Sequence, residues 1–197
     1  MAAPSGLNAD YFSFLGLPRK LRIDMNDLEQ RYRALSRQFH PDYFHNAGAA
    51  ERRASLERSS YLNDAYRALK HPMARIEYLL KIENGGAGQP AADGGVPAGL
   101  LEEVFALNEE LDEIRELRAG NAPPETWKPR LERARQPIEA KRRDHEAQLE
   151  ALSAQWDAAV DAGKEDRRAI LAALRERFLE RNYIANLLAG IEGELNA

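Results

Sequence analysis

The stretch that decides the fold runs from residue 28 to residue 42 and reads LEQRYRALSRQFHPD. Its large apolar residues recur at positions i, i+4, i+7 and i+11 and are Leu28, Tyr32, Leu35 and Phe39. This spacing predicts a helix that begins near Asp24 and commits one face to a core. Pro41 ends the helix, because proline cannot continue its hydrogen bonding. A loop is therefore expected at the carboxyl end of the helix.

The sequence on both sides of this helix is also helical. Asp10 can cap a short helix that Gly16 and Pro18 then stop. Downstream, we expect a long helix over residues 49–70, which returns antiparallel to the first across the loop. Pro72 suits the first position of a further helix. The N-terminal part is thus predicted to be an all-α module built on an antiparallel helical hairpin.

A Gly-, Ala- and Pro-rich segment at residues 84–99 has almost nothing to bury and is interpreted as a flexible linker. It divides a module of residues 1–83 from one of residues 100–197. Three helices on short loops, near 100–120, 125–162 and 165–195, predict that the second module is a three-helix bundle. Pro129 and Pro137 interrupt the middle helix, which either begins at one of them or kinks there.

Composition excludes several classes of function. Charged residues make up 30% of the chain and its formal net charge is −4, which does not favour binding of the whole molecule to nucleic acid or to an anionic membrane. There is no cysteine, so disulfides, thiolate zinc sites and cysteine-ligated metal clusters are excluded. No apolar run has the length of a membrane span and the first residues show no targeting pattern, so we expect a cytoplasmic protein.

One group of residues carries chemistry. The tripeptide His40-Pro41-Asp42 follows the amphipathic helix and places an imidazole and a carboxylate on an exposed loop, where the arginine of a partner could meet the carboxylate. Three other interpretations remain open. The tripeptide could form a metal site with His45, or a general acid/base pair, although no nucleophile accompanies it. Asp42 could also simply begin a turn while His40 caps its helix.

Several motifs along the chain resemble one family. They are Asp10-Tyr11-Phe12, Leu15-Gly16-Leu17-Pro18, the tripeptide at residues 40–42, the stretch LNDAYRAL at residues 62–69, and Pro72. Together they are similar to a J domain from end to end. The stretch RIEYLL at residues 75–80, followed by a three-helix C-terminal segment, resembles the HscB-type iron–sulphur cluster co-chaperones. The resemblance implies that the two modules form an L-shaped pair.

The resemblance implies how the N-terminal module acts. The family's tripeptide loop docks on a DnaK/HscA-type ATPase chaperone, so Asp42 would engage an arginine of the chaperone while His40 and Pro41 hold the loop. The basic surface of the preceding helix would supply long-range attraction and consists of Arg31, Arg33 and Arg37. Without the loop beside them, these arginines would be interpreted as an ordinary solvated face.

The resemblance also implies a second surface, which binds the IscU-type iron–sulphur cluster scaffold protein. Its matching residues are Leu101, Phe105, Glu109 and Phe178. We expect Phe178 to be partly exposed on the flank of its helix; the alternative is that Phe105 and Phe178 pack inside the bundle. This chain carries Glu102 and Ala106 where relatives often have methionine and glutamate.

The absence of cysteine fits the bacterial type of this family, which lacks a cysteine zinc motif. The chain is then expected to be an adaptor without enzymatic activity or a cofactor, which couples ATP turnover to release of the cluster. Two alternatives stay open. A general J-domain co-chaperone would deliver unfolded clients, and a helical nucleic-acid-binding or regulatory protein would use the basic helix as its binding surface.

Overall fold

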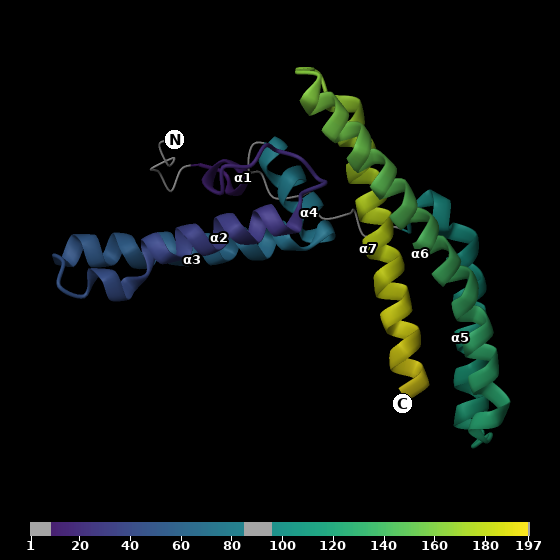
Figure 1. Ribbon diagram of the computed structural model, residues 1–197. Helices are drawn as coiled ribbons and strands as arrows, with labels where there is room; N and C mark the ends of the chain where they lie inside the picture. Colours follow the sequence, from purple (N-terminus) through teal and green to yellow (C-terminus); the bar gives the residue numbers. More distant parts are fainter. Residues whose placement is uncertain (1–8, 85–95, 197) are drawn as a thin grey trace. The chain divides into compact units, whose positions relative to one another are not determined.

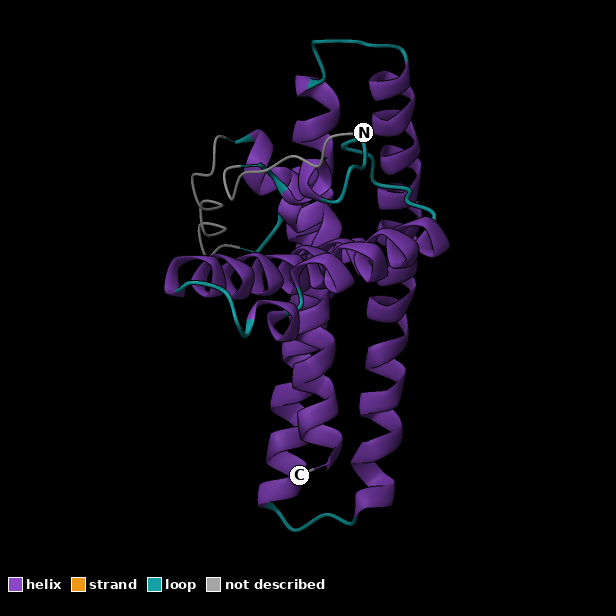
Figure 2. Cartoon of the chain, turned by 60° about the vertical axis from the view of Figure 1, so that its left-hand side comes forward, coloured by secondary structure: helices purple, strands orange, loops and turns teal. Residues whose placement is uncertain are grey.

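The structure is a computed structural model that describes residues 9–84 and 96–196. Within these ranges the chain is helical and has no strand (Figure 2), which confirms the predicted all-α fold. The helices form two compact units. Unit 1 contains the described residues up to 84 together with 153–171, and unit 2 contains 96–152 together with 172–196. The expected linker at 84–99 falls largely on residues 85–95, outside the described residues.

Unit 1 is built on an antiparallel helical hairpin. Its elements are α1 (Tyr11–Phe14), α2 (Met25–Phe39), the 3₁₀ helix η1 (Pro41–Phe44), α3 (Ala49–Lys70) and α4 (Pro72–Glu83). The helices α2 and α3 lie side by side (Figure 1). Carboxylates begin the first two helices, since Asp10 accepts a hydrogen bond from the Ser13 amide at 3.1 Å and Asp24 accepts one from Asn26 at 2.8 Å.

The large apolar residues at positions 28, 32, 35 and 39 join α2 to the rest of unit 1. Leu28 and Phe39 are buried, while Tyr32 and Leu35 are half-buried. The ring of Tyr32 stacks on that of Tyr66 from α3, with centroids 4.2 Å apart. Fully buried leucines from α3 and α4 complete the apolar core. Burying a large apolar side chain stabilises a fold by about 1.5–3 kcal/mol, so this core holds the hairpin together.

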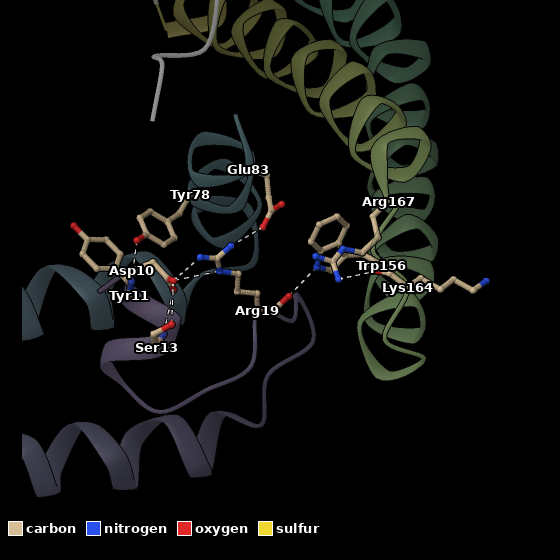
Figure 3. Close-up of polar contacts among 9 residues, drawn as sticks. All are labelled: Asp10, Tyr11, Ser13, Arg19, Tyr78, Glu83, Trp156, Lys164 and Arg167. Atoms are coloured by element: carbon tan, nitrogen blue, oxygen red, sulfur yellow. Dashed lines mark hydrogen bonds and ion pairs between the residues drawn. The ribbon is translucent and has the colours of Figure 1, made fainter. Parts of the chain in front are cut away.

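Unit 1 also includes the ends of two C-terminal helices, a feature that the sequence did not predict. Trp156 is completely buried, and its indole N–H donates to the carbonyl of Arg19 at 2.8 Å (Figure 3). The neighbouring carboxylate of Asp157 accepts hydrogen bonds from the amides of Leu21, at 2.7 Å, and Arg22, at 2.9 Å. The segment that joins α1 to α2 is therefore held by side chains far along the chain.

Unit 2 is formed by the 3₁₀ helix η2 (Ala98–Leu100) and by most of α5 (Leu101–Ala119), α6 (Pro124–Asp161) and α7 (Arg168–Asn196). Its core gathers residues from all three helices, among them Ile114, Trp127, Leu131 and Ile184. Proline stands at the first position of α6, as expected for a residue without an amide hydrogen. The helix then runs through Pro129 and Pro137, so the prediction that it could begin at one of them is wrong.

No helix in the described ranges combines the length and the apolar character needed to cross a membrane.

Candidate interaction surfaces

The loop at residues 40–42 is anchored where α2 ends. The carbonyl of Phe39, the last residue of α2, accepts a buried hydrogen bond from the hydroxyl of Ser55 on α3 at 2.8 Å. His40 then takes an extended conformation, and Pro41 begins η1 at a position where proline is favoured. The backbone of the loop is thus fixed at its base and within its first turn.

Two imidazoles hold the backbone of Asp42 and leave its carboxylate in solvent. The Nδ1 atom of His40 accepts a hydrogen bond from the Asp42 amide at 3.3 Å, and the Nδ1 atom of His45 donates to the Asp42 carbonyl at 2.7 Å. The side chain of Asp42 is 86% exposed, with one oxygen 3.5 Å from the ring of His40. The His40 side chain therefore caps the start of η1, whereas the sequence had left open that it caps the end of α2; the Asp42 carboxylate stays accessible.

No group of three or more potential metal ligands occurs within residues 9–84 and 96–196. The turn at residues 40–45 is instead held by hydrogen bonds between the two imidazoles and the backbone of Asp42. Among the described residues, no further potential metal ligand joins His40, Asp42 and His45.

The three arginines of the predicted basic surface differ in their contacts. Arg31 is engaged inside unit 1, because it binds Asp27 at 2.8 Å and the carbonyl of Gly16 at 2.7 Å. Gly16 has a φ of +67°, and a Cβ atom there would lie 2.9 Å from the Arg31 guanidinium. Arg33 is exposed and pairs with Glu29 at 2.6 Å. Arg37 is exposed and has no ion pair with any residue that the structure describes.

Sequence reasoning missed an aromatic side chain beside the loop. Tyr43 directly follows Asp42 and is 73% exposed, and its ring centroid lies 6.1 Å from that of His40. Its position within η1, where one face must point to solvent, is the signal that could have revealed it. A large exposed aromatic group next to an exposed carboxylate is typical of a binding surface.

The second predicted surface is partly assembled on α5. Leu101 and Phe105 are 41% and 71% exposed, and Glu109 is exposed as well. These residues follow one another at intervals of four and therefore share a face of the helix. Glu102 and Ala106 are exposed next to them. The alternative that Phe105 packs inside the bundle is wrong.

Phe178 does not have the partial exposure that we expected, since only 3% of it is accessible. Ile170, eight positions before Phe178, is only half-buried. Leu174, four positions before Phe178, is fully buried. Residues four apart lie on the same face of a helix, so the face that buries Leu174 also buries Phe178.

Buried and half-buried polar side chains connect the helices of unit 2. His145 on α6 is 3% exposed, and its Nε2 atom lies 2.9 Å from the carboxylate of Glu180 on α7. The same carboxylate accepts a hydrogen bond from Arg177 at 2.5 Å. On α5, Glu103 binds Lys141 of α6 at 2.8 Å, and this hydrogen bond holds the pKa of Glu103 below its usual value. Sequence analysis did not single out these residues, because their roles depend on which helices meet.

Comparisons with known proteins agree with this geometry. Residues 10–78 match the family model of the DnaJ domain. The chain is similar to the solved structure of the chaperone HscB from Vibrio cholerae, with 27% sequence identity and a TM-score of 0.60 over 95% of this chain and 98% of that one. It is also similar to the crystal structure of the human co-chaperone protein HscB, with 26% identity and a TM-score of 0.66 over 98% of this chain and 85% of that one.

The family match covers the hairpin, the anchored loop and the exposed Asp42, and the structural matches continue through the C-terminal helices. The chain has no cysteine, so it carries no cysteine zinc motif. It is a J-domain co-chaperone that resembles HscB over nearly its whole length.

Proposed function

We propose that this protein stimulates ATP hydrolysis by a DnaK/HscA-type chaperone and delivers an IscU-type iron–sulphur cluster scaffold to that chaperone. The observation that carries the first half is the carboxylate of Asp42, 86% exposed on a loop whose backbone is already ordered. A partner that binds it meets a negative charge in a fixed position.

The loop suits recognition by an arginine. A guanidinium binds a carboxylate through charge-assisted hydrogen bonds, which are stronger than neutral ones. Because His40 and His45 fix the backbone before the partner arrives, little further conformational entropy is lost on binding. The exposed ring of Tyr43 offers apolar contact area beside this charge. Arg33 and Arg37 present positive charge on the helix that precedes the loop, which favours an approach to an acidic surface.

The exposed face of α5 supports the second half of the proposal. Phe105 is 71% exposed beside Leu101, and acidic side chains lie around them at Glu102 and Glu109. Large aromatic side chains of this kind often contribute most of the binding energy of an interface. We propose that Leu101, Phe105 and Glu109 contact the scaffold, whereas the buried Phe178 does not. One protein that binds both partners raises the effective concentration of each at the other.

Single-turnover ATP hydrolysis by the cognate DnaK-type chaperone tests the first half. We expect Asp42→Asn to abolish stimulation while it leaves folding intact, because the side chain lies in solvent. Asp144→Asn makes the same chemical change at an exposed position of α6 and should stimulate as the wild type does. Full stimulation by the Asp42→Asn variant would exclude this role of the loop.

Addition of the scaffold tests the second half and separates the alternatives. We expect the scaffold to increase stimulation by the wild-type protein and to have little effect with Phe105→Ala. Leu56→Ala removes another exposed apolar side chain, from α3, and serves as the control, because Leu56 is 58% exposed in unit 1. Stimulation that is indifferent to the scaffold would favour a general J-domain co-chaperone for unfolded clients.

A further inference from the structure

A groove of about 700 Å³ runs between α5 and α6 in unit 2. Four of its lining residues are apolar, two from each helix: Ala106 and Leu107 from α5, and Ala134 and Pro137 from α6. Both alanines are small, which leaves space between the two helices. Ala106 and its neighbour Glu102 lie next to Leu101 and Phe105 on α5, so the groove continues the exposed apolar face of that helix toward α6.

The charges along the groove are only partly neutralised. Arg130 on α6 binds Glu110 on α5 at 2.6 Å, and Lys141 binds Glu103 at 2.8 Å, so these pairs bridge the two helices. Two other lining residues, Glu102 on α5 and Arg133 on α6, make no ion pair with the residues described by the structure. The Nε of Arg133 donates to the carbonyl of Pro129 at 3.3 Å, and the other nitrogens of its guanidinium and the carboxylate of Glu102 remain available to a partner.

We infer that this groove receives a segment of the scaffold protein. That segment carries an apolar side chain between a basic and an acidic one. The apolar side chain covers Ala106 and Ala134, the basic one meets Glu102, and the acidic one meets Arg133. This inference rests on the proposed function and specifies it further. It extends the scaffold-binding surface from α5 onto α6, whereas the sequence had placed the rest of that surface on α7 at Phe178, which is buried.

Charge reversal on α6 tests the inference with the full-length protein and its cognate scaffold. We expect Arg133→Glu to raise the Kd for the scaffold at least tenfold, and Arg133→Lys to keep it within threefold of the wild type. Arg143→Glu makes the same charge reversal at an exposed position of α6 outside the groove and should change the Kd less than twofold. Circular dichroism checks that the variants are folded, and chaperone stimulation without scaffold should be unchanged in all of them.

A label placed at the groove provides a second, independent readout. Because the chain has no cysteine, Gln136→Cys allows one environment-sensitive fluorophore to be attached beside Pro137. We expect its emission to shift to shorter wavelength when the scaffold binds, and the emission of the same label at Ala151→Cys, an exposed position farther along α6, to stay unchanged.

The possible outcomes distinguish a failure of the groove inference from a failure of the proposed function. If Phe105→Ala loses scaffold binding while Arg133→Glu binds normally and the label at residue 136 does not respond, the groove is excluded and the surface on α5 stands. If the wild-type protein binds no scaffold, the proposed function fails and the inference fails with it.

Discussion

Individual carboxylates serve opposite purposes in this protein according to their burial. The Asp42 side chain is 86% exposed and is available to a partner. Asp157 is only 8% exposed and accepts hydrogen bonds from the amides of Leu21 and Arg22. Arg75, which is 3% exposed, donates a hydrogen bond to the carbonyl of Leu21. The segment around Leu21 is therefore fixed through its backbone polar groups, by side chains from α4 and α6.

Removal of the Asp157 carboxylate should destabilise unit 1. Asp157→Ala leaves two amides without their charged acceptor, and we expect the free energy of unfolding to fall by about 2–4 kcal/mol. Urea denaturation of the full chain measures this loss, and hydrogen exchange at the Leu21 and Arg22 amides should become faster. The control is Asp161→Ala: this aspartate is 63% exposed and pairs with Lys20 in solvent, so its loss should cost less than about 1 kcal/mol. Equal effects of the two variants would contradict the role of Asp157.

Tyr78 should cause a loss of stability at high pH. Burial raises the pKa of its phenol to about 12, although the Tyr11 amide, which donates to this oxygen at 2.8 Å, acts in the opposite direction. Between about pH 10, the ordinary tyrosine pKa, and pH 12 the unfolded chain ionises here while the folded chain does not, so stability falls as the pH rises. We expect Tyr78→Phe to show a shallower decline of the unfolding free energy over this window. A decline as steep as that of the wild type would contradict the raised pKa.

At the scale of single elements, the sequence predicted helices well where local signals agreed with packing. The bounds expected for α3, residues 49–70, match the structure, because Pro72 and the loop before Ala49 limit it on both sides. In α6 the prolines left two alternatives open, a later start of the helix or a kink. The helix nevertheless passes through them, because Trp127, which precedes both, is only 5% exposed in the core of unit 2. Helix propensity, which depends on local sequence alone, does not include the free energy gained when such a side chain is buried, and this gain offsets the cost of a proline inside the helix.

Tertiary contacts also explain which site residues the sequence could not place. The exposure of Phe105 and the burial of Phe178 depend on how each helix is rotated against its neighbours. The engagement of Arg31 depends on the loop at Gly16, which is close in space and fifteen residues away in sequence. Asp42, in contrast, stands in a short local motif, and its exposure followed from the turn that Pro41 begins.

The prolines inside α6 should therefore cost stability that a substitution can recover. We expect Pro137→Ala to raise the free energy of unfolding by about 1–3 kcal/mol, since alanine restores the hydrogen bond to the Arg133 carbonyl and has the higher helix propensity. Pro124→Ala is the matched control: this proline occupies the first position of the helix, where its missing amide hydrogen costs nothing, so we expect no gain. Thermal denaturation compares the two, and a Pro137→Ala protein that is no more stable would show that the helix has adapted fully to the proline.

For the whole molecule, the net charge and the local charge differ in sign. The chain carries a formal charge of −4, yet α2 presents Arg33 and Arg37 beside the loop that bears Asp42. The binding surface proposed for the chaperone lies in unit 1 and the one proposed for the scaffold lies in unit 2. The sequence predicted one binding surface on each module, but it did not predict that residues 153–171 would belong with the N-terminal helices. That assignment depends on the contacts of Trp156 and Asp157, which join positions more than 130 residues apart.

This charge distribution predicts how salt affects binding to the chaperone. Attraction between exposed charges is screened within about 8 Å at physiological ionic strength, so the association rate constant should fall as salt is added, while the dissociation rate changes little. We expect the Arg33→Gln/Arg37→Gln double variant to associate about three- to tenfold more slowly at low salt and to approach the wild type at high salt, because it lacks the charges that salt screens.

Arg143→Gln/Arg168→Gln removes the same charge from exposed positions outside α2 and should keep the salt dependence of the wild type. Stopped-flow measurements over a range of ionic strengths distinguish these cases. If both double variants slow association equally, the attraction would depend on net charge alone, and the basic face of α2 would have no special part in it.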